Sequence, residues 1–196
     1  MSAREKILRT LRQRKLDVPP LPSLDGPWIA YDDRAAQFAK ALAAVGGQAF
    51  MASSMSDALA QVARLPVLAS ARKVLSLVPG VERATVDAAA VSAPHAVEDV
   101  DVTVVQAPFG VAENAAVWIA IDRVADRAAL FLCQHLIVLV EASALVDNMH
   151  QAYARLGKLE RGFGVFLSGP SKTADIEQSL VIGAHGARSA SVFIVG

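Results

Sequence analysis

The stretch ALFLCQHLIVLVE, residues 129–141, decides the fold, because it contains a buried strand that we place at His135–Val140. Further apolar strands are predicted at 47–52, 73–78, 101–108, 113–121 (after a tight turn at Phe109-Gly110), 162–168 and 191–195. Helix-like segments separate them, at 33–45, from Ser56 or Asp57 to Leu65, at 145–156 and at 174–182. Continuous apolar strands that alternate with helices are typical of a mostly parallel sheet covered on both faces. The sequence therefore predicts a three-layer α/β fold and leaves the strand order open.

The composition excludes several classes of protein. The chain has 196 residues, of which 54% are hydrophobic and 19% charged, and its formal net charge is +0. One large domain with a sizeable core fits these values, whereas a nucleic-acid-binding protein usually carries a basic surplus. The single cysteine, Cys133, excludes an internal disulfide and an iron–sulfur cluster held by this chain alone. We therefore expect no resident cofactor, whether cluster, flavin or metal, and no partnership with nucleic acid.

No stretch of the sequence predicts a membrane span. The most apolar segment, 128–146, is interrupted by Gln134, His135 and Glu141, and a spanning helix needs about 20 mostly apolar residues. The N-terminal residues are polar and charged, without the apolar region of a secretory signal. We expect a cytoplasmic protein.

The N-terminal region is predicted to differ from the rest of the chain. Residues 3–16 form an amphipathic helix with an apolar stripe of Ile7, Leu8 and Leu11, which we interpret as a docking or oligomer-facing helix. Residues 17–27 contain four prolines and a glycine, so they form a linker or a wrap-around arm. The expected organisation is an arm at 1–27 and an α/β domain at 28–196.

The stretch SGPSKTADIEQSLVIGAHG, residues 168–186, is the first candidate for chemistry. A strand ends at Ser168, and a helix is expected to start near Thr173 or Ala174. Such a helix start binds anions through exposed N–H groups, and Lys172 adds a positive charge. The alternative is architecture: Ser171, Thr173 and Asp175 cap the helix, and Glu177 ties down a neighbouring loop.

His185 lies between Gly183 and Gly186 in the same stretch, on a turn where the backbone is free to adopt positive φ. Imidazole titrates near neutral pH and serves as acid, base or ligand. The alternative is a histidine that interacts with the last carbonyls of a helix.

The second candidate is QAPFGVAENAAVWIA, residues 106–120, in which small residues surround Glu113 and Asn114. A carboxylate in such a place can act as a nucleophile or a base, although a solvated turn explains it equally well. If the two candidate stretches form one site, Glu113 and the turn at 168–173 line a common cleft at the carboxyl ends of parallel strands.

Other residues are weaker candidates. Cys133 and His135 would share a face of a strand as half of a metal site, but buried packing is the better interpretation. His95 and His150 receive no role. We predict no metal site.

The first stretch closely resembles the C-terminal signature of the lactate-utilisation (LUD) domain family, and within it the LutC/YkgG-like group. The matching residues are Ser168, Gly169, Pro170, Ser171, Thr173, Ala174, Asp175, Ile176, Glu177, Gly183, His185 and Gly186. The segment FGVAENAAVW is similar to the family's other landmark through Gly110, Val111, Ala112 and Glu113. Asn114-Ala115 replaces the family's usual Thr-Gly, and Ala187 replaces a common proline.

The resemblance implies a fold like that of the NagB/RpiA/CoA-transferase-like group and a role in the bacterial oxidation of L-lactate to pyruvate. Companion proteins would carry the iron–sulfur clusters, and this chain would be the cluster-free subunit that binds a small carboxylate or phosphorylated ligand. Two alternatives remain open: an acyl- or CoA-transferring enzyme with Glu113 as nucleophile and His185 as acid or base, and a non-catalytic scaffold subunit. The expected ligand-binding residues are Gly110, Asn114, Ser168, Gly169, Ser171, Lys172, Thr173, Asp175 and Glu177.

Overall fold

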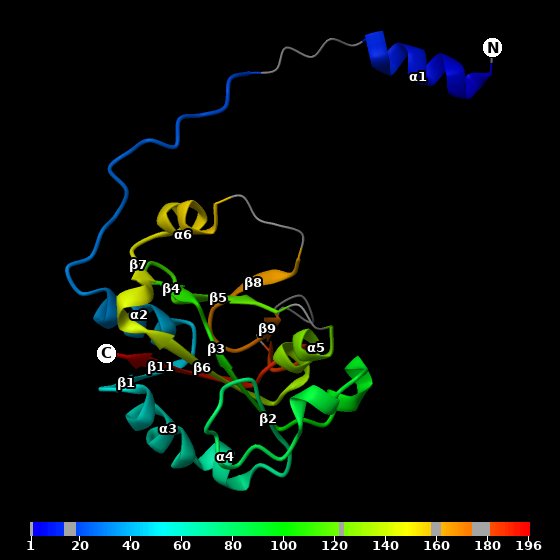
Figure 1. Cartoon of the computed structure of the whole chain (residues 1–196). Helices are drawn as coiled ribbons and strands as arrows, with labels where there is room; N and C mark the ends of the chain where they lie inside the picture. The colour runs from blue at the N-terminus through cyan, green and yellow to red at the C-terminus, as the bar shows by residue number, and fades with distance from the viewer. Residues whose placement is uncertain (1, 14–18, 122–123, 158–161, 174–180) are drawn as a thin grey trace.

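The computed structural model describes residues 2–13, 19–121, 124–157, 162–173 and 181–196. Its centre is a five-stranded sheet in which every neighbouring pair of strands is parallel (Figure 1). In spatial order the strands are β1 (Gln48–Ala52), β11 (Ser189–Val195), β6 (His135–Glu141), β3 (Val102–Gln106) and β2 (Val74–Ser76). The prediction of a mostly parallel α/β fold is confirmed.

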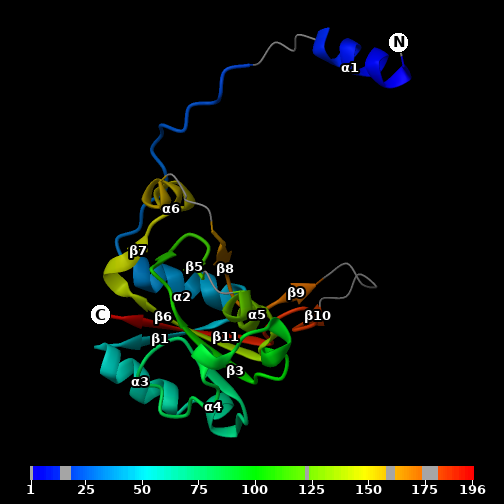
Figure 2. The ribbon, with the colours of Figure 1, turned by 45° about the vertical axis from the view of Figure 1, so that its right-hand side comes forward.

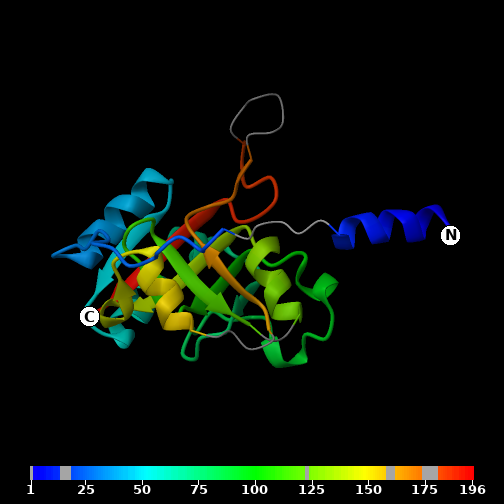
Figure 3. The ribbon, with the colours of Figure 1, turned by 90° about the horizontal axis from the view of Figure 1, so that it is seen from above.

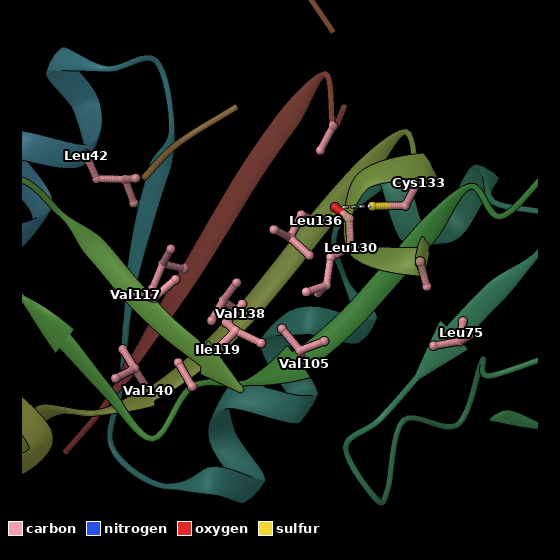
Figure 4. Close-up of a cluster of buried hydrophobic side chains, with 14 of the residues drawn as sticks. Leu42, Leu75, Val105, Val117, Ile119, Leu130, Cys133, Leu136, Val138 and Val140 are labelled. Atoms are coloured by element: carbon pink, nitrogen blue, oxygen red, sulfur yellow. Dashed lines mark hydrogen bonds between the residues drawn. The ribbon is translucent and has the colours of Figure 1, made fainter. Parts of the chain in front are cut away.

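The apolar run in β6 is continuous because both faces of this strand are buried. Leu136, Val138 and Val140 point into one core cluster (Figure 4). Ile137 and Leu139 point into another cluster on the opposite face. Successive side chains of a strand alternate between faces, so a central strand covered twice requires an apolar residue at each position.

Two layers enclose the sheet. On one face, α3 (Met55–Ala63) and α4 (Pro66–Ser70) contribute Ala58, Val62 and Leu68 to the core. The opposite face is covered by α2 (Arg34–Ala44), α5 (Val124–Leu132) and a second sheet (Figure 2). Asp33 caps α2 by accepting the Ala36 N–H, and Ser54 rather than Ser56 or Asp57 caps α3.

The second sheet has the order β7 (Leu145–Val146), β4 (Phe109–Val111), β5 (Ala116–Ala120) and β8 (Gly164–Leu167). Strand β5 is antiparallel to both β4 and β8, while β7 is parallel to β4. Val117 and Ile119 face the main core, and Trp118 faces the cluster under α6 (Met149–Leu156), which covers the outside of this sheet (Figure 3). Short 3₁₀ helices lie at η1 (Ala88–Ala90), η2 (Pro94–Val97) and η3 (Ala142–Ala144).

Several predicted elements are wrong in detail. Phe109-Gly110 belongs to β4, and the turn lies at 112–115, where the Asn114 side chain accepts the Ala116 N–H. The segment 145–156, which we predicted as a helix, begins with the short strand β7. The helix α6 starts only at Met149, after its cap residue Asn148.

Two further corrections concern helices. The apolar residues at the start of 129–141 belong to the helix α5. We did not predict this helix, because its apolar residues run directly into those of the following strand in the sequence. The predicted helix at 174–182 is wrong at its end: Val181–Ile182 form β10, antiparallel to β9 (Lys172–Thr173). The rest of that segment, 174–180, lies outside the described residues.

At the N-terminus, α1 (Ala3–Gln13) has no buried residue, and residues 19–30 are exposed and irregular. The end of this arm nevertheless lies against α6. The Trp28 ring stacks on the His150 ring at 3.6 Å between centroids, and the Asn148 side chain donates a hydrogen bond to the Ile29 carbonyl at 2.7 Å. No described helix has the length and apolarity that crossing a bilayer requires.

Candidate functional site

The turn that follows β8 packs on the end of α2. Gly169 has φ +70°, and a Cβ on it would lie 2.8 Å from the Val45 side chain, so both its conformation and its surroundings require glycine. At Ser171 the chain then passes between Gly183, directly after β10, and Ala187, shortly before β11. The Ser171 N–H donates to the Ala187 carbonyl at 2.8 Å, and the Ser171 carbonyl accepts the Gly183 N–H at 3.0 Å. Ser171 is therefore fixed by its backbone on both sides.

The segment GAHG, residues 183–186, folds back onto this turn, beside β9 and β10 (Figure 2). Thr173 Oγ1 lies 3.3 Å from His185 Nδ1. Of the two glycines around His185, Gly183 has positive φ, as predicted, at +80°. Gly186 serves a different purpose: a Cβ there would lie 3.0 Å from the Ser171 Cβ, so glycine permits the close approach of the two segments.

The strand pairing changes the chemistry expected of this stretch. Lys172 and Thr173 pair with Ile182 and Val181 in an antiparallel ladder, and the Ser171 N–H donates to the Ala187 carbonyl, so the described backbone at 171–173 is a strand and not a helix start with its row of free N–H groups. Asp175 and Glu177, which we assigned to capping or ligand binding, lie outside the described residues.

A cavity of about 300 Å³ connects the two ends of the signature stretch. Its polar wall includes Ser168, Ser171, Lys172 and His185, and its apolar wall includes Leu130, Phe131, Leu136, Phe166 and Leu167. We call it the signature cavity. It combines one cation, hydroxyl groups, an imidazole and an apolar floor, which suits a small anion with an apolar part.

The signature cavity lies at the amino-terminal edge of the central sheet, because Leu136 is at the start of β6 and Ala187 precedes β11. The prediction of a cleft at the carboxyl ends is therefore wrong for this turn. At the same edge, His135 Nδ1 lies 2.7 Å from Ser189 Oγ. Burial, and then the nearby Arg188 charge, lower the pKa of His135 and favour its neutral form.

Cys133 is a packing residue. It is 1% exposed, its Sγ lies 3.8 Å from the Leu130 carbonyl (Figure 4), and burial raises the pKa of the thiol to about 11. Within the described part of the chain, no three His, Cys, Asp or Glu side chains are grouped as a metal site would require.

Glu113 and Asn114 contact different elements. Glu113 Oε2 accepts the Met149 N–H at 3.0 Å and so stabilises the first turn of α6. The Asn114 carbonyl accepts the Ser168 hydroxyl at 2.7 Å, which joins the two candidate stretches directly. Glu113 does not line the signature cavity, so the two stretches meet without forming the common cleft that we predicted. Gly110 lies in β4, where a Cβ would be 2.9 Å from Leu145.

Sequence reasoning missed one polar cluster. The Arg34 guanidinium donates two hydrogen bonds to the Asp147 carboxylate, at 2.8 and 2.9 Å, and the Tyr31 N–H and the Gln151 amide also donate to it. Asp147 is 2% exposed, and chiefly the Arg34 hydrogen bonds lower its pKa to about 2. No motif in the sequence marks this pair, because its members are 113 positions apart.

Comparisons with known proteins agree with these observations. The family model of the LUD domain matches residues 76–195. "Lactate utilization protein C" of Bacillus pumilus is 38% identical over 90 residues, which are 43% of this chain and 38% of that protein. The protein of the same name from Geobacillus kaustophilus is 32% identical over 123 residues, which are 60% of this chain and 48% of that protein. The chain thus matches about half or less of the length of these curated relatives.

A solved structure resembles the fold. The crystal structure of a DUF162 family protein from Deinococcus radiodurans has a TM-score of 0.61 at 17% identity and covers 86% of this chain and 99% of its own. The LUD match takes in β3, β6, the second sheet, the signature cavity and β11, and it covers more than half of the chain. This chain therefore belongs to the LUD domain family.

Proposed function

We propose that this protein is a component of a bacterial L-lactate oxidation system, in which it is a cluster-free subunit that binds a small carboxylate or phosphorylated ligand. The similarity to proteins named Lactate utilization protein C supports the system, and the single cysteine supports a subunit whose iron–sulfur clusters reside in partner proteins. The proposed location is the cytoplasm.

The observation that carries the ligand proposal is the signature cavity. Lys172 supplies the positive charge, and the Ser168 and Ser171 hydroxyls and the His185 imidazole supply hydrogen bonds. The apolar floor of Phe131, Leu136 and Phe166 contacts the remainder of a small organic acid. His185, hydrogen-bonded to Thr173, is the group in this cavity that is suited to hold or move a proton.

The structure gives less support to the acyl-transfer alternative. A nucleophilic carboxylate must reach its substrate, yet Glu113 lies outside the signature cavity, and one oxygen of its exposed carboxylate accepts the Met149 N–H at the first turn of α6. We therefore propose that Glu113 positions the start of α6, and with it the adjacent residue Asn114 in the turn.

The substitution Ser171→Asp tests the ligand proposal. It places a carboxylate beside Lys172, so like-charge repulsion should weaken binding of an anion at least tenfold, while the half-buried side chain leaves the fold intact. Binding of pyruvate and of inorganic phosphate is measured by calorimetry, and growth on lactate is measured in a bacterial host that lacks its own counterpart of the protein.

Ser70→Asp is the matched control, because Ser70 is an exposed residue of α4, whose core contacts lie on the other face of the central sheet. The control should bind and complement like the wild type. Full growth on lactate with the folded Ser171→Asp variant would contradict the proposal.

A further inference from the structure

A second cavity, of about 480 Å³, lies far along the chain from the signature stretch. Its walls are α3, the start of α4 and the loop at 79–83 that follows β2. The loop packs directly on α3, since a Cβ on Gly80 would lie 3.1 Å from the Leu59 side chain. We call this cavity the α3 cavity. None of the residues that line the signature cavity belongs to it.

The floor of the α3 cavity is apolar and ordered by the core. Val62 and Leu68 are each 1% exposed and belong to the core cluster beneath the central sheet, and Leu59 and Val81 pack against the same cluster. Because Val62 and Leu68 are already covered, a ligand that entered this cavity would contact chiefly the half-buried Leu59 and Val81, which rest on the core. Burial of its apolar part against them would be favourable.

The rim carries an excess of positive charge. Arg64, at the end of α3, and Arg83, in the loop, line the cavity together with one acidic residue, Glu82. In the described part of the chain, no carboxylate lies within 4.0 Å of either guanidinium. Arg83 donates one long hydrogen bond, of 3.4 Å, to the Ala71 carbonyl, which leaves most of its donors available.

Asp57 interacts electrostatically with Arg64, but its carboxylate does not use up the hydrogen-bond donors of the Arg64 guanidinium. Hydrogen bonds, first from the Ser53 N–H, lower the pKa of Asp57, and the Arg64 charge contributes least among the causes. The Asp57 carboxylate accepts the Ser53 N–H at 2.9 Å and the Ser53 hydroxyl at 3.1 Å, so it is already held at the start of α3. The planar guanidinium of Arg64 therefore keeps donors for another carboxylate.

We propose that the α3 cavity binds a small organic anion with an apolar chain, that is, an amphiphilic monocarboxylate. Two guanidinium groups from separate elements would hold the carboxylate, and the half-buried Leu59 and Val81 would contact the chain. A bare inorganic anion would leave the apolar floor in water, and a neutral apolar molecule would leave the arginine donors without a partner. This site is separate from the one in the proposed function and does not depend on it.

The test is calorimetric titration of the 196-residue chain with octanoate. In the Ser171→Asp chain, whose signature cavity should no longer take a carboxylate, we expect saturable binding of one octanoate, and at least tenfold weaker binding of both octanol and inorganic phosphate. Arg64→Gln and Arg83→Gln should each weaken octanoate binding about fivefold or more, and the double variant should abolish it, because each removes one charge-assisted contact. Arg9→Gln on α1 is the control with the same change of charge, and it should bind normally.

A second variant separates binding from folding. Ala60→Phe fills the α3 cavity from an exposed position of α3 without changing the charge, and it should abolish octanoate binding while thermal unfolding stays as in the wild type. The arginine variants and Ala60→Phe are also made in the Ser171→Asp chain, so that octanoate bound at the signature cavity does not mask the result and failure here is distinguishable from failure of the proposed function. Absence of octanoate binding, equal binding of octanol, or unchanged binding in the folded double arginine variant would each overturn the proposal.

Discussion

At the scale of single residues, Ala115 shows how the sequence departs from its family pattern at a structural cost. Ala115 has φ +55° and is the single non-glycine residue with positive φ among those that the structure describes. It stands where the resemblance places a glycine, in the turn that carries Glu113 and Asn114. Alanine in the left-handed region is strained, and the burial of its methyl group, 1% exposed, offsets that strain.

Ala115→Gly and Ala116→Gly form a matched pair that measures this strain. At Ala116 glycine loses about 0.8 kcal/mol of methyl burial and about 0.5–1 kcal/mol of chain entropy. At Ala115 the same losses are offset by relief of about 1–2 kcal/mol of left-handed strain. We expect Ala116→Gly to lower the free energy of unfolding by about 1.5 kcal/mol and Ala115→Gly to change it little, as measured by urea denaturation. Equal losses at the two positions would contradict the strain.

Asp147 predicts a pH dependence of stability. The folded pKa of about 2 lies below the unfolded value of about 3.9, so the carboxylate stabilises the fold above pH 4 and loses this effect as the pH falls towards 2. Asp147→Asn should therefore lower stability by roughly 2 kcal/mol at pH 7, and the difference from the wild type should shrink by pH 2.5. Comparing the two proteins isolates Asp147 from Asp57 and Asp101, whose pKa values are also lowered. A constant difference across this range would exclude the linkage.

At the scale of elements, the central strand β6 was predictable because burial on both faces makes its interior, from Leu136 to Val140, continuously apolar. The helix α2 was predictable as well, since Asp33 precedes an apolar stripe that includes Phe38 and Leu42. The pairing of β9 with β10 was not predictable. Two-residue strands have no periodicity, and what holds them, such as the Ser171 backbone bonds to Gly183 and Ala187, joins residues 12 to 16 positions apart.

The candidate site was predictable in composition but not in geometry. The signature stretch does bring Ser171 and Lys172 to one cavity with His185, yet the cavity opens at the amino-terminal edge of the sheet. The general preference for carboxyl ends failed because β8 belongs to the second sheet, where it runs antiparallel to β5, so its end returns over α2. Which edge a turn reaches depends on the pairing of its strand, and the sequence left that pairing open.

At the scale of the whole molecule, the arm divides into a free part and a docked part. Nothing in α1 is buried, whereas Trp28, Ile29 and Tyr31 contact α6 or the loop before it. Within the arm, the Trp28 indole N–H also donates to the Leu24 carbonyl at 2.9 Å. The apolar stripe of α1, Ile7, Leu8 and Leu11, is exposed, and its docking on a partner stays a prediction.

Two truncated chains test which part of the N-terminal arm stabilises the folded domain. Removal of residues 2–18 should leave the free energy of unfolding unchanged, because no described residue in this part is buried. Removal of residues 2–31 takes away the Trp28–His150 stack and two hydrogen bonds to the residues at 147–148, which together stabilise by about 1–3 kcal/mol. Urea denaturation of both proteins checks this, and an equal stability of the two truncated chains would show that the arm docks without stabilising the fold.

In the lactate-growth assay, the shorter truncation should fold normally yet fail to complement, since it removes the helix proposed to dock on a partner.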